Sequence, residues 1–258
     1  MPRDPVYVRL PSVRGETLVF VADDDLWIGS PLGGLARRLT ADHTPLNDPK
    51  LSPDGNSVAY AGRRDGLSEV YAVGTDGSPV RRLTYWGDTM TRVIGWADDD
   101  HVIAISAVGE PFASRTWAYA VPVAGGTPER LLYGPITGLA KGPAGAVVLG
   151  VNQLARRAPS WKRYRGGTAP VLWIDRDAGG VFEPYLRGLD GQLEDPGWVG
   201  DRVLFVSDHE GTGNIYTAAP DGSAVQRHTD HTDFYARAAS TDGETVVLPA
   251  RRRALATG

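Results

Sequence analysis

SVAYAGRRDGLSEVYAVGTDGSPVRRLT, residues 57–84, carries the pattern that decides the fold. An apolar run at 57–61 is followed by a second at 70–73, by the turn 75–77, and by a short segment that ends in Arg-Arg-Leu-Thr. Asp-Gly turns join neighbouring strands well, because glycine tolerates positive φ and aspartate hydrogen-bonds its own backbone. The segment therefore predicts short antiparallel strands connected by tight turns.

The same order of features returns along the chain. Leu39-Thr40 recurs as Leu83-Thr84, 44 positions later, and an aromatic residue stands in the third strand-like run of each copy. These aromatic residues are Trp27, Tyr71, Tyr119, Trp173 and Tyr216. A repeat of this length with four short strands is typical of one blade of a β-propeller. We predict that the aromatic residues are buried where one blade packs on the next, because they carry the largest apolar area.

The number of copies predicts the number of blades. Five copies occupy about residues 1–236, and a sixth begins in 237–250 with a closing strand, the turn Ser240–Gly243 and the run Glu244–Leu248. Residues 251–258 do not match the pattern. We predict that residues 1–258 form one domain, an all-β, six-bladed propeller with TolB-like or WD40-like blades, whose sixth blade is incomplete because the chain stops partway through it.

Composition excludes several classes of function. The formal net charge of -4 gives no positive field for a nucleic acid, and the absence of cysteine excludes disulfides, thiolate nucleophiles and cysteine-bound zinc. The first residues contain no apolar signal segment, and no apolar run reaches the length that spans a bilayer. The expectation is a cytosolic protein that binds neither nucleic acid nor membrane.

Three short motifs resemble catalytic or metal-binding chemistry. Ser207-Asp208-His209 contains the residue types of a triad, but neighbouring side chains on a strand point to opposite faces, which favours chance. His43 and His231 occupy equivalent places in the repeat, which favours a loop-stabilising hydrogen bond over metal ligation. The acidic run 23–25 is interpreted as a solvated turn in preference to a cation site. We predict no catalytic residue, no metal site and no cofactor.

A basic and aromatic insertion, residues 154–169, interrupts the fourth copy. Arginines and lysine alternate there with aromatic rings, a pattern that also suits single-stranded nucleic acid, but the net acidity of the chain argues against that ligand. We predict instead a contact with a neighbouring domain or subunit. The predicted interface residues are Trp161, Lys162, Tyr164 and Arg165.

The segment Pro159–Thr168, followed by Val171–Ile174, resembles the N-terminal six-bladed propeller of the tricorn proteases, as do 24–27, 111–114 and 231–237. The resemblance implies a module of a large cytosolic, oligomeric serine peptidase that degrades oligopeptides. In that family the catalytic serine and histidine lie in C-terminal domains beyond two propellers, so no catalytic residue transfers to this chain. The implied function is a substrate or product channel and an assembly surface, with oligopeptides and the C-terminal domains or other subunits as partners.

One binding residue transfers by the resemblance. The family carries arginine in the loop after the Leu-Thr of the second blade, where it is thought to hold the C-terminal carboxylate of a substrate. The corresponding loop, 85–92, makes Arg92 the candidate, although it stands alone where the family has an adjacent pair. Two other functions stay open: a TolB-like propeller that scaffolds a protein partner, and a propeller hydrolase with an axial metal.

Overall fold

The computed structural model describes residues 7–152 and 163–249, and within them the backbone forms 22 β-strands and one 3₁₀ turn, η1 (Pro143–Gly145), with no α-helix. Blade 1 comprises β1 (Arg9–Arg14), β2 (Thr17–Ala22), β3 (Asp25–Gly29) and β4 (Arg37–Arg38). Blade 2 comprises β5 (Leu46–Leu51), β6 (Ser57–Gly62), β7 (Glu69–Gly74) and β8 (Arg81–Arg82). Blade 3 comprises β9 (Arg92–Trp96), β10 (His101–Ser106), β11 (Trp117–Pro122) and β12 (Glu129–Pro135).

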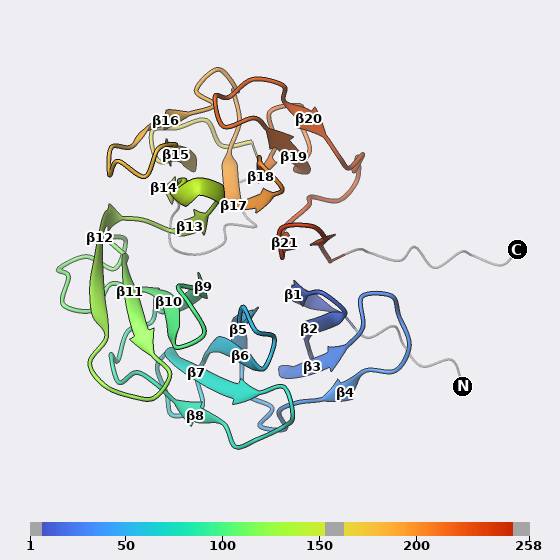
Figure 1. Ribbon diagram of the computed structural model, residues 1–258, viewed down its shortest axis with the longest axis vertical. Helices are drawn as coiled ribbons and strands as arrows, with labels where there is room; N and C mark the ends of the chain where they lie inside the picture. The colour runs from blue at the N-terminus through green and yellow to red at the C-terminus, as the bar shows by residue number, and fades with distance from the viewer. Residues whose placement is uncertain (1–6, 153–162, 250–258) are drawn as a thin grey trace, which may run out of the picture.

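Blade 4 comprises β13 (Gly138–Lys141), β14 (Val147–Val151), β15 (Val171–Asp175) and β16 (Glu183–Tyr185). Blade 5 comprises β17 (Leu193–Val199), β18 (Arg202–Ser207), β19 (Asn214–Ala218) and β20 (Gln226–Arg227). A final hairpin pairs β21 (Ser240–Thr241) with β22 (Val246–Val247). Each blade is an antiparallel meander whose strands follow chain order, and Figure 1 shows the first strand of each blade nearest the common centre.

The blades pack face to face through alternating side chains of their middle strands. On β6, Val58 and Tyr60 join the core shared with blade 1, whereas Ala59 between them joins the core shared with blade 3. This alternation follows from the two-residue period of a strand, which sends successive side chains to opposite faces. Each middle strand is therefore apolar on both faces, which is why it reads as a continuous apolar run.

The predicted aromatic positions lie between blades in a consistent direction. Tyr71, Tyr119, Trp173 and Tyr216 each pack in the core shared with the preceding blade. Trp27 belongs to blade 1, which has no complete blade before it among the described residues; its ring is half-buried and lies under the guanidinium of Arg38. The repeat thus places the same residue type at five equivalent positions, four of which are covered by a neighbouring blade.

The prediction of six blades was wrong, because the structure has five blades. Residues 237–250, which were expected to begin a sixth, contribute only the hairpin β21 and β22. The hairpin lies beside blade 1 and blade 5 near the centre, and in the described residues no strand fills the outer space between β20 and β4 (Figure 1). The prediction counted turn motifs, and the last turn motif was counted as a blade although its segment forms only two short strands.

Two of the inner strands, β5 and β17, are interrupted by bulges, which hides their bounds from sequence patterns. The pairing of β5 with β6 shifts between Asn47 and Lys50, and that of β17 with β18 shifts between Glu194 and Gly197. The bulges contain Asp48 and Asp195, both in the left-handed region (φ 52° and 48°) and each followed by proline. Proline inside a strand-like run argues against a strand, so the bulge hides these elements from pattern analysis.

The ring is closed through the hairpin. The Gly15 amide of blade 1 donates to Asp242 Oδ2 of the hairpin turn (2.8 Å). On the other side, Thr241 Oγ1 donates to the Trp198 carbonyl (3.3 Å), and the Gly200 amide donates to the Gly243 carbonyl (2.8 Å). Two short strands therefore connect the first blade to the fifth.

Candidate functional site

A small cavity of about 50 Å³ lies between the inner strands of the ring and is partly open. Residues of β5, β9, β13 and β17 and Ala239 beside the hairpin line it. Its charged lining residues are Lys50, Arg92 and Asp195. The cavity is the place where side chains from most of the ring converge, and it contains the arginine that the sequence singled out.

Arg92 is the first residue of β9, and its guanidinium is already paired. Its Nε donates to Asp48 Oδ2 (3.0 Å), and Nη2 lies 3.5 Å from Oδ1. The side chains of Arg92 and Asp48 are 12% and 4% exposed. Arg92 Nη1 is buried and has no hydrogen-bond partner among the described residues. Carboxylate anchoring by Arg92 stays a prediction, and an incoming carboxylate would compete with Asp48 for the guanidinium.

The other bulge aspartate makes an equivalent link. Asp195 Oδ2 accepts a hydrogen bond from the Ala238 amide (3.0 Å), just before the hairpin. Asp48 and Asp195 therefore each reach from one inner segment to the next. The left-handed backbone of the bulges turns these carboxylates along the ring, and sequence reasoning missed both.

The predicted interface loop contacts blade 5 of its own chain. Arg165 Nη1 lies 3.1 Å from Asp208 Oδ1 and its Nε lies 3.3 Å from Asp190 Oδ1. The Tyr164 hydroxyl accepts a hydrogen bond from Thr168 (3.1 Å), within the loop. Trp161 and Lys162 lie outside the described residues. Arg165 thus has an internal structural role, and the docking of the loop on a partner is a prediction that the structure leaves untested.

Asp208, at the end of β18, is the buried centre of this contact, with no exposed side-chain surface. Its carboxylate accepts hydrogen bonds from the amides of Gln192 (2.9 Å) and Arg163 (2.8 Å), besides the Arg165 guanidinium. Burial alone would raise the pKa of Asp208, but the Tyr235 hydroxyl, these amides and Arg165 together lower it below the usual value. The site therefore holds an ionised carboxylate that ties the insertion to blade 5.

Ser207, Asp208 and His209 do not form a triad. His209 Nδ1 lies 3.0 Å from Ser207 Oγ, but Ser207 is 1% exposed and the Asp208 carboxylate is taken by the contacts just described. Burial lowers the pKa of His209 below its usual value despite the nearby Glu210 and Asp208. A nucleophile needs access to substrate, so this serine has no catalytic geometry.

A buried cluster of hydrogen bonds, called a knot below, forms around the threonine of the Leu-Thr motif. The acidic or amide residue that bonds this threonine was not predicted from the sequence. Thr84 Oγ1 donates to Glu69 Oε2 (2.5 Å) and accepts from the Val70 amide (2.9 Å). The equivalent pairs are Thr40 with Asp25 in blade 1 and Thr229 with Asn214 in blade 5. Each partner is the first residue of a third strand, and a polar residue directly before an apolar-aromatic run is the signal that could have found it.

The histidines at equivalent positions belong to these knots. The His231 amide donates to Asn214 Oδ1 (2.8 Å), and the His43 amide lies 3.4 Å from Asp25 Oδ1. The loop is stabilised at these positions by the histidine backbone amides and not by a hydrogen bond of the His231 Nε2, which is buried without a partner among the described residues. In the acidic run 23–25, Asp25 is buried in a knot while Asp24 pairs with Arg9. Across residues 7–152 and 163–249, no group of three or more His, Asp or Glu is arranged to hold a metal ion.

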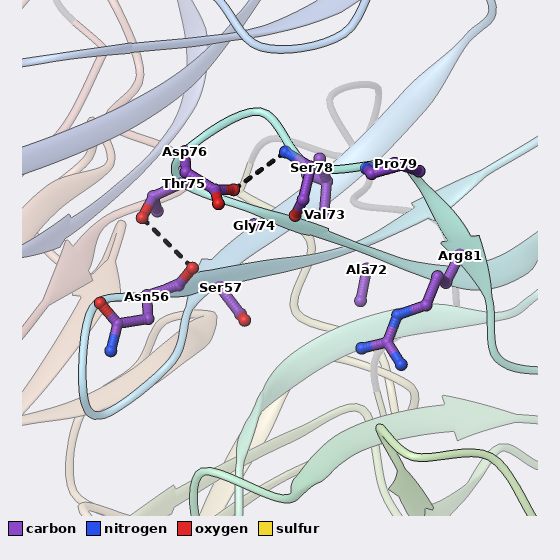
Figure 2. Close-up of a pocket in the computed structure, with 10 residues that line it drawn as sticks. All are labelled: Asn56, Ser57, Ala72, Val73, Gly74, Thr75, Asp76, Ser78, Pro79 and Arg81. Carbon is purple, nitrogen blue, oxygen red and sulfur yellow. Dashed lines mark hydrogen bonds between the residues drawn. The ribbon is translucent and has the colours of Figure 1, made fainter.

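A hollow on blade 2 is lined by polar side chains, and its carboxylate is already engaged in a hydrogen bond. Figure 2 shows the Thr75 hydroxyl bonded to the backbone carbonyl of Asn56, and Arg81 farther along the same hollow near Ala72. The Asp76 carboxylate accepts from the Ser78 amide (2.9 Å) and so stabilises its own turn. This hollow is a by-product of a tight turn.

In the part of the chain that the structure describes, no helix has the length and apolar character needed to cross a membrane.

Comparison with known proteins identifies the family. The model of the tricorn protease N-terminal beta propeller domain matches residues 5–253. Tricorn protease homolog 1 of Streptomyces coelicolor is 48% identical over 246 residues, which are 95% of this chain and 23% of that protein. The putative Tricorn-like protease N-terminal subunit of Sulfurisphaera tokodaii is 30% identical over 178 residues, covering 67% of this chain and 88% of that subunit. The crystal structure of the tricorn protease gives a TM-score of 0.84 at 29% identity, covering 95% of this chain and 24% of the other.

The chain spans about a quarter of the length of the S. coelicolor protein and nearly the whole of the S. tokodaii subunit. The family model and the solved structure agree with the ring of blades described above. The chain therefore belongs to the tricorn protease family, within its N-terminal β-propeller domain.

Proposed function

We propose that this chain is a non-catalytic propeller module of a tricorn-type protease, which conducts peptides along its axis and provides a surface for assembly with the catalytic part. The axial cavity carries the proposal: the inner strands converge on a charged lining that includes Lys50, Arg92 and Asp195. Charged groups of both signs suit a peptide, whose two ends carry opposite charges. Hydrolysis is assigned to the catalytic part, since Ser207, which lies beside the half-buried His209 in the described residues, is itself buried.

The small volume of the cavity limits what can pass through it without movement of side chains. About 50 Å³ holds a few water molecules at about 15 Å³ each, and not an amino-acid residue. Passage of a peptide therefore requires inner side chains to move. The Arg92 to Asp48 pair joins neighbouring inner strands beside the cavity, so its opening is the step that we expect to control passage.

The absence of cysteine makes a direct test practical, because one introduced thiol is the only site of maleimide labelling. Ala239→Cys places the thiol on the cavity wall, and Ser223→Cys places it on an exposed outer turn as the matched control. In a tricorn-type protease that contains this propeller, and whose cysteines outside the propeller have been replaced, labelling Ala239→Cys with a bulky maleimide should remove most of the oligopeptide turnover. Equal turnover by the two labelled variants would reject the axial route.

Assembly is tested at Trp161 alone, without Arg165, a predicted interface residue whose contacts the structure describes. Arg165→Ala would remove one contact of the buried Asp208 carboxylate. A loss of assembly would then not separate a lost partner contact from a change inside the chain. Trp161 is not among the described contacts of Asp208, and Trp161→Ala should weaken the association of the propeller with the catalytic part, measured by light scattering. Unchanged association would remove the insertion from the assembly surface.

A further inference from the structure

A second pocket, of about 360 Å³, lies where three segments meet beside blade 5. Arg163 comes from the insertion, Gly211 and Thr212 from the turn before β19, and residues 232–235 from the segment after blade 5. It shares no lining residue with the axial cavity. Its volume falls at the lower end of the range of about 300 to 1,000 Å³ that is usual for small-ligand sites.

The guanidinium of Arg163 is held in one orientation at this pocket. The Arg163 backbone amide donates to Asp208 Oδ2 (2.8 Å), and its Nε donates to the Gly211 carbonyl (2.8 Å). No described residue accepts a hydrogen bond from Nη1 or Nη2. Gly211 has φ +109°, a backbone conformation that favours glycine, and a Cβ there would be in ordinary contact with Arg163 Nη2 at 3.4 Å. A guanidinium fixed at its Nε edge presents its two Nη groups to a ligand.

The opposite side of the pocket is aromatic and is also held in place. The Phe234 ring packs edge-on against His231, with centroids 4.4 Å apart. The Tyr235 hydroxyl bonds the buried Asp208, and the Tyr235 ring fills the space that a Cβ on Gly213 would take. Arg163 and Tyr235 are therefore positioned by one carboxylate, which fixes the spacing between the cationic and the aromatic sides.

We propose that this pocket binds a carboxylate that stands next to an apolar side chain, with the carboxylate on the Nη groups of Arg163 and the side chain against Phe234. A planar guanidinium matches a carboxylate through paired hydrogen bonds, and an aromatic ring contributes apolar contact. Asp233 also lines the pocket, and its carboxylate repels a multiply charged anion such as phosphate more than a single carboxylate. The C-terminal residue of a short peptide and a free amino acid both have this chemistry; peptides as the natural source rest on the proposed function.

Isothermal titration of the full chain tests the site with three probes: acetyl-Ala-Phe, its C-terminal amide, and inorganic phosphate. The acid should bind at least about tenfold more tightly than the amide and than phosphate. Free phenylalanine, titrated separately, distinguishes an amino-acid site from a peptide site. The proposal would be overturned if the acid and the amide bound with similar affinity, or if phosphate bound as tightly as the acid.

Variants locate the binding. Arg163→Gln and Phe234→Ala should each weaken acetyl-Ala-Phe by about tenfold, whereas Arg187→Gln, an exposed arginine outside the pocket, should not. Arg163→Lys retains the charge without the fork and serves if the glutamine variant fails to fold. Unaltered affinity in both Arg163 variants would also overturn the proposal. Because the axial route is tested by labelling at Ala239 in the protease, failure here and failure there are separate results.

Discussion

Asp208→Ala is expected to lower the free energy of unfolding by about 3 kcal/mol. The substitution leaves the amides of Gln192 and Arg163 without their acceptor in a site where the carboxylate has no exposed surface. Each buried donor that loses its partner costs about 1 to 3 kcal/mol. The Arg165 guanidinium is 32% exposed and regains water, so its share is small.

Urea unfolding measures the effect. With a slope of about 3 kcal/mol per molar for a domain of this size, the midpoint should fall by about 1 M. Asp221→Ala is the matched control: that carboxylate is exposed and accepts the Ser223 amide of its own turn (2.9 Å), so its loss should cost less than about 1 kcal/mol. Hydrogen exchange should accelerate at the amides of Gln192 and Arg163 in Asp208→Ala alone.

A midpoint for Asp208→Ala that matches the Asp221→Ala control would refute the reasoning. It would mean that water or a rearranged loop satisfies the two amides at no cost, and that the carboxylate is not what ties the insertion to blade 5. Unaltered exchange at both amides would carry the same conclusion independently of the unfolding curve.

Three further outcomes follow from the contacts. Asp242→Ala removes the acceptor of the Gly15 amide, so stability should fall by about 1 kcal/mol and exchange at Gly15 should accelerate; an unchanged exchange rate would show that the hairpin does not close the ring. Thr84→Val breaks the knot with Glu69 and should cost about 1 to 3 kcal/mol in urea unfolding, against less than about 0.5 kcal/mol for the exposed control Thr127→Val; equal losses would contradict the role of the motif. Because the pKa of folded His209 is lowered, the unfolded chain takes up the proton first, so stability should fall as the pH drops below about 6.5, and His209→Gln should flatten that slope between about pH 7 and pH 5; an identical slope in both proteins would exclude His209 as its source.

Local chemistry made the blades predictable. The turn at Asp76 and the aromatic positions such as Tyr71 follow from a few neighbouring residues, so the repeat located the middle strands and their packing. Two of the inner strands, β5 and β17, escaped because Pro49 and Pro196 interrupt them at bulges whose conformation no local pattern reveals. The number of blades was wrong because residues 237–250 contain a closing turn but form only a short hairpin.

The candidate sites were less predictable, since they are assembled from distant segments. Arg92 was found by resemblance, but its partner Asp48 lies 44 residues earlier on another blade. Arg165 was assigned to a partner protein, although Asp208, 43 residues later, accepts it within the chain. From the sequence, the charged residues of a long insertion are expected to be accessible to a partner. The fold shows which of them form ion pairs within the chain.

The hairpin that joins blade 1 to blade 5 has a mechanical consequence. Among the described residues, one hydrogen bond to blade 1 and two to blade 5 fasten this hairpin, so these contacts can separate while every four-stranded sheet remains intact. An extended polypeptide would then enter from the flank, along the parted contact, and would not need a free terminus. On the proposed route, cyclic peptides would then be admitted as linear ones are, whereas end-first threading through a permanent ring would exclude them.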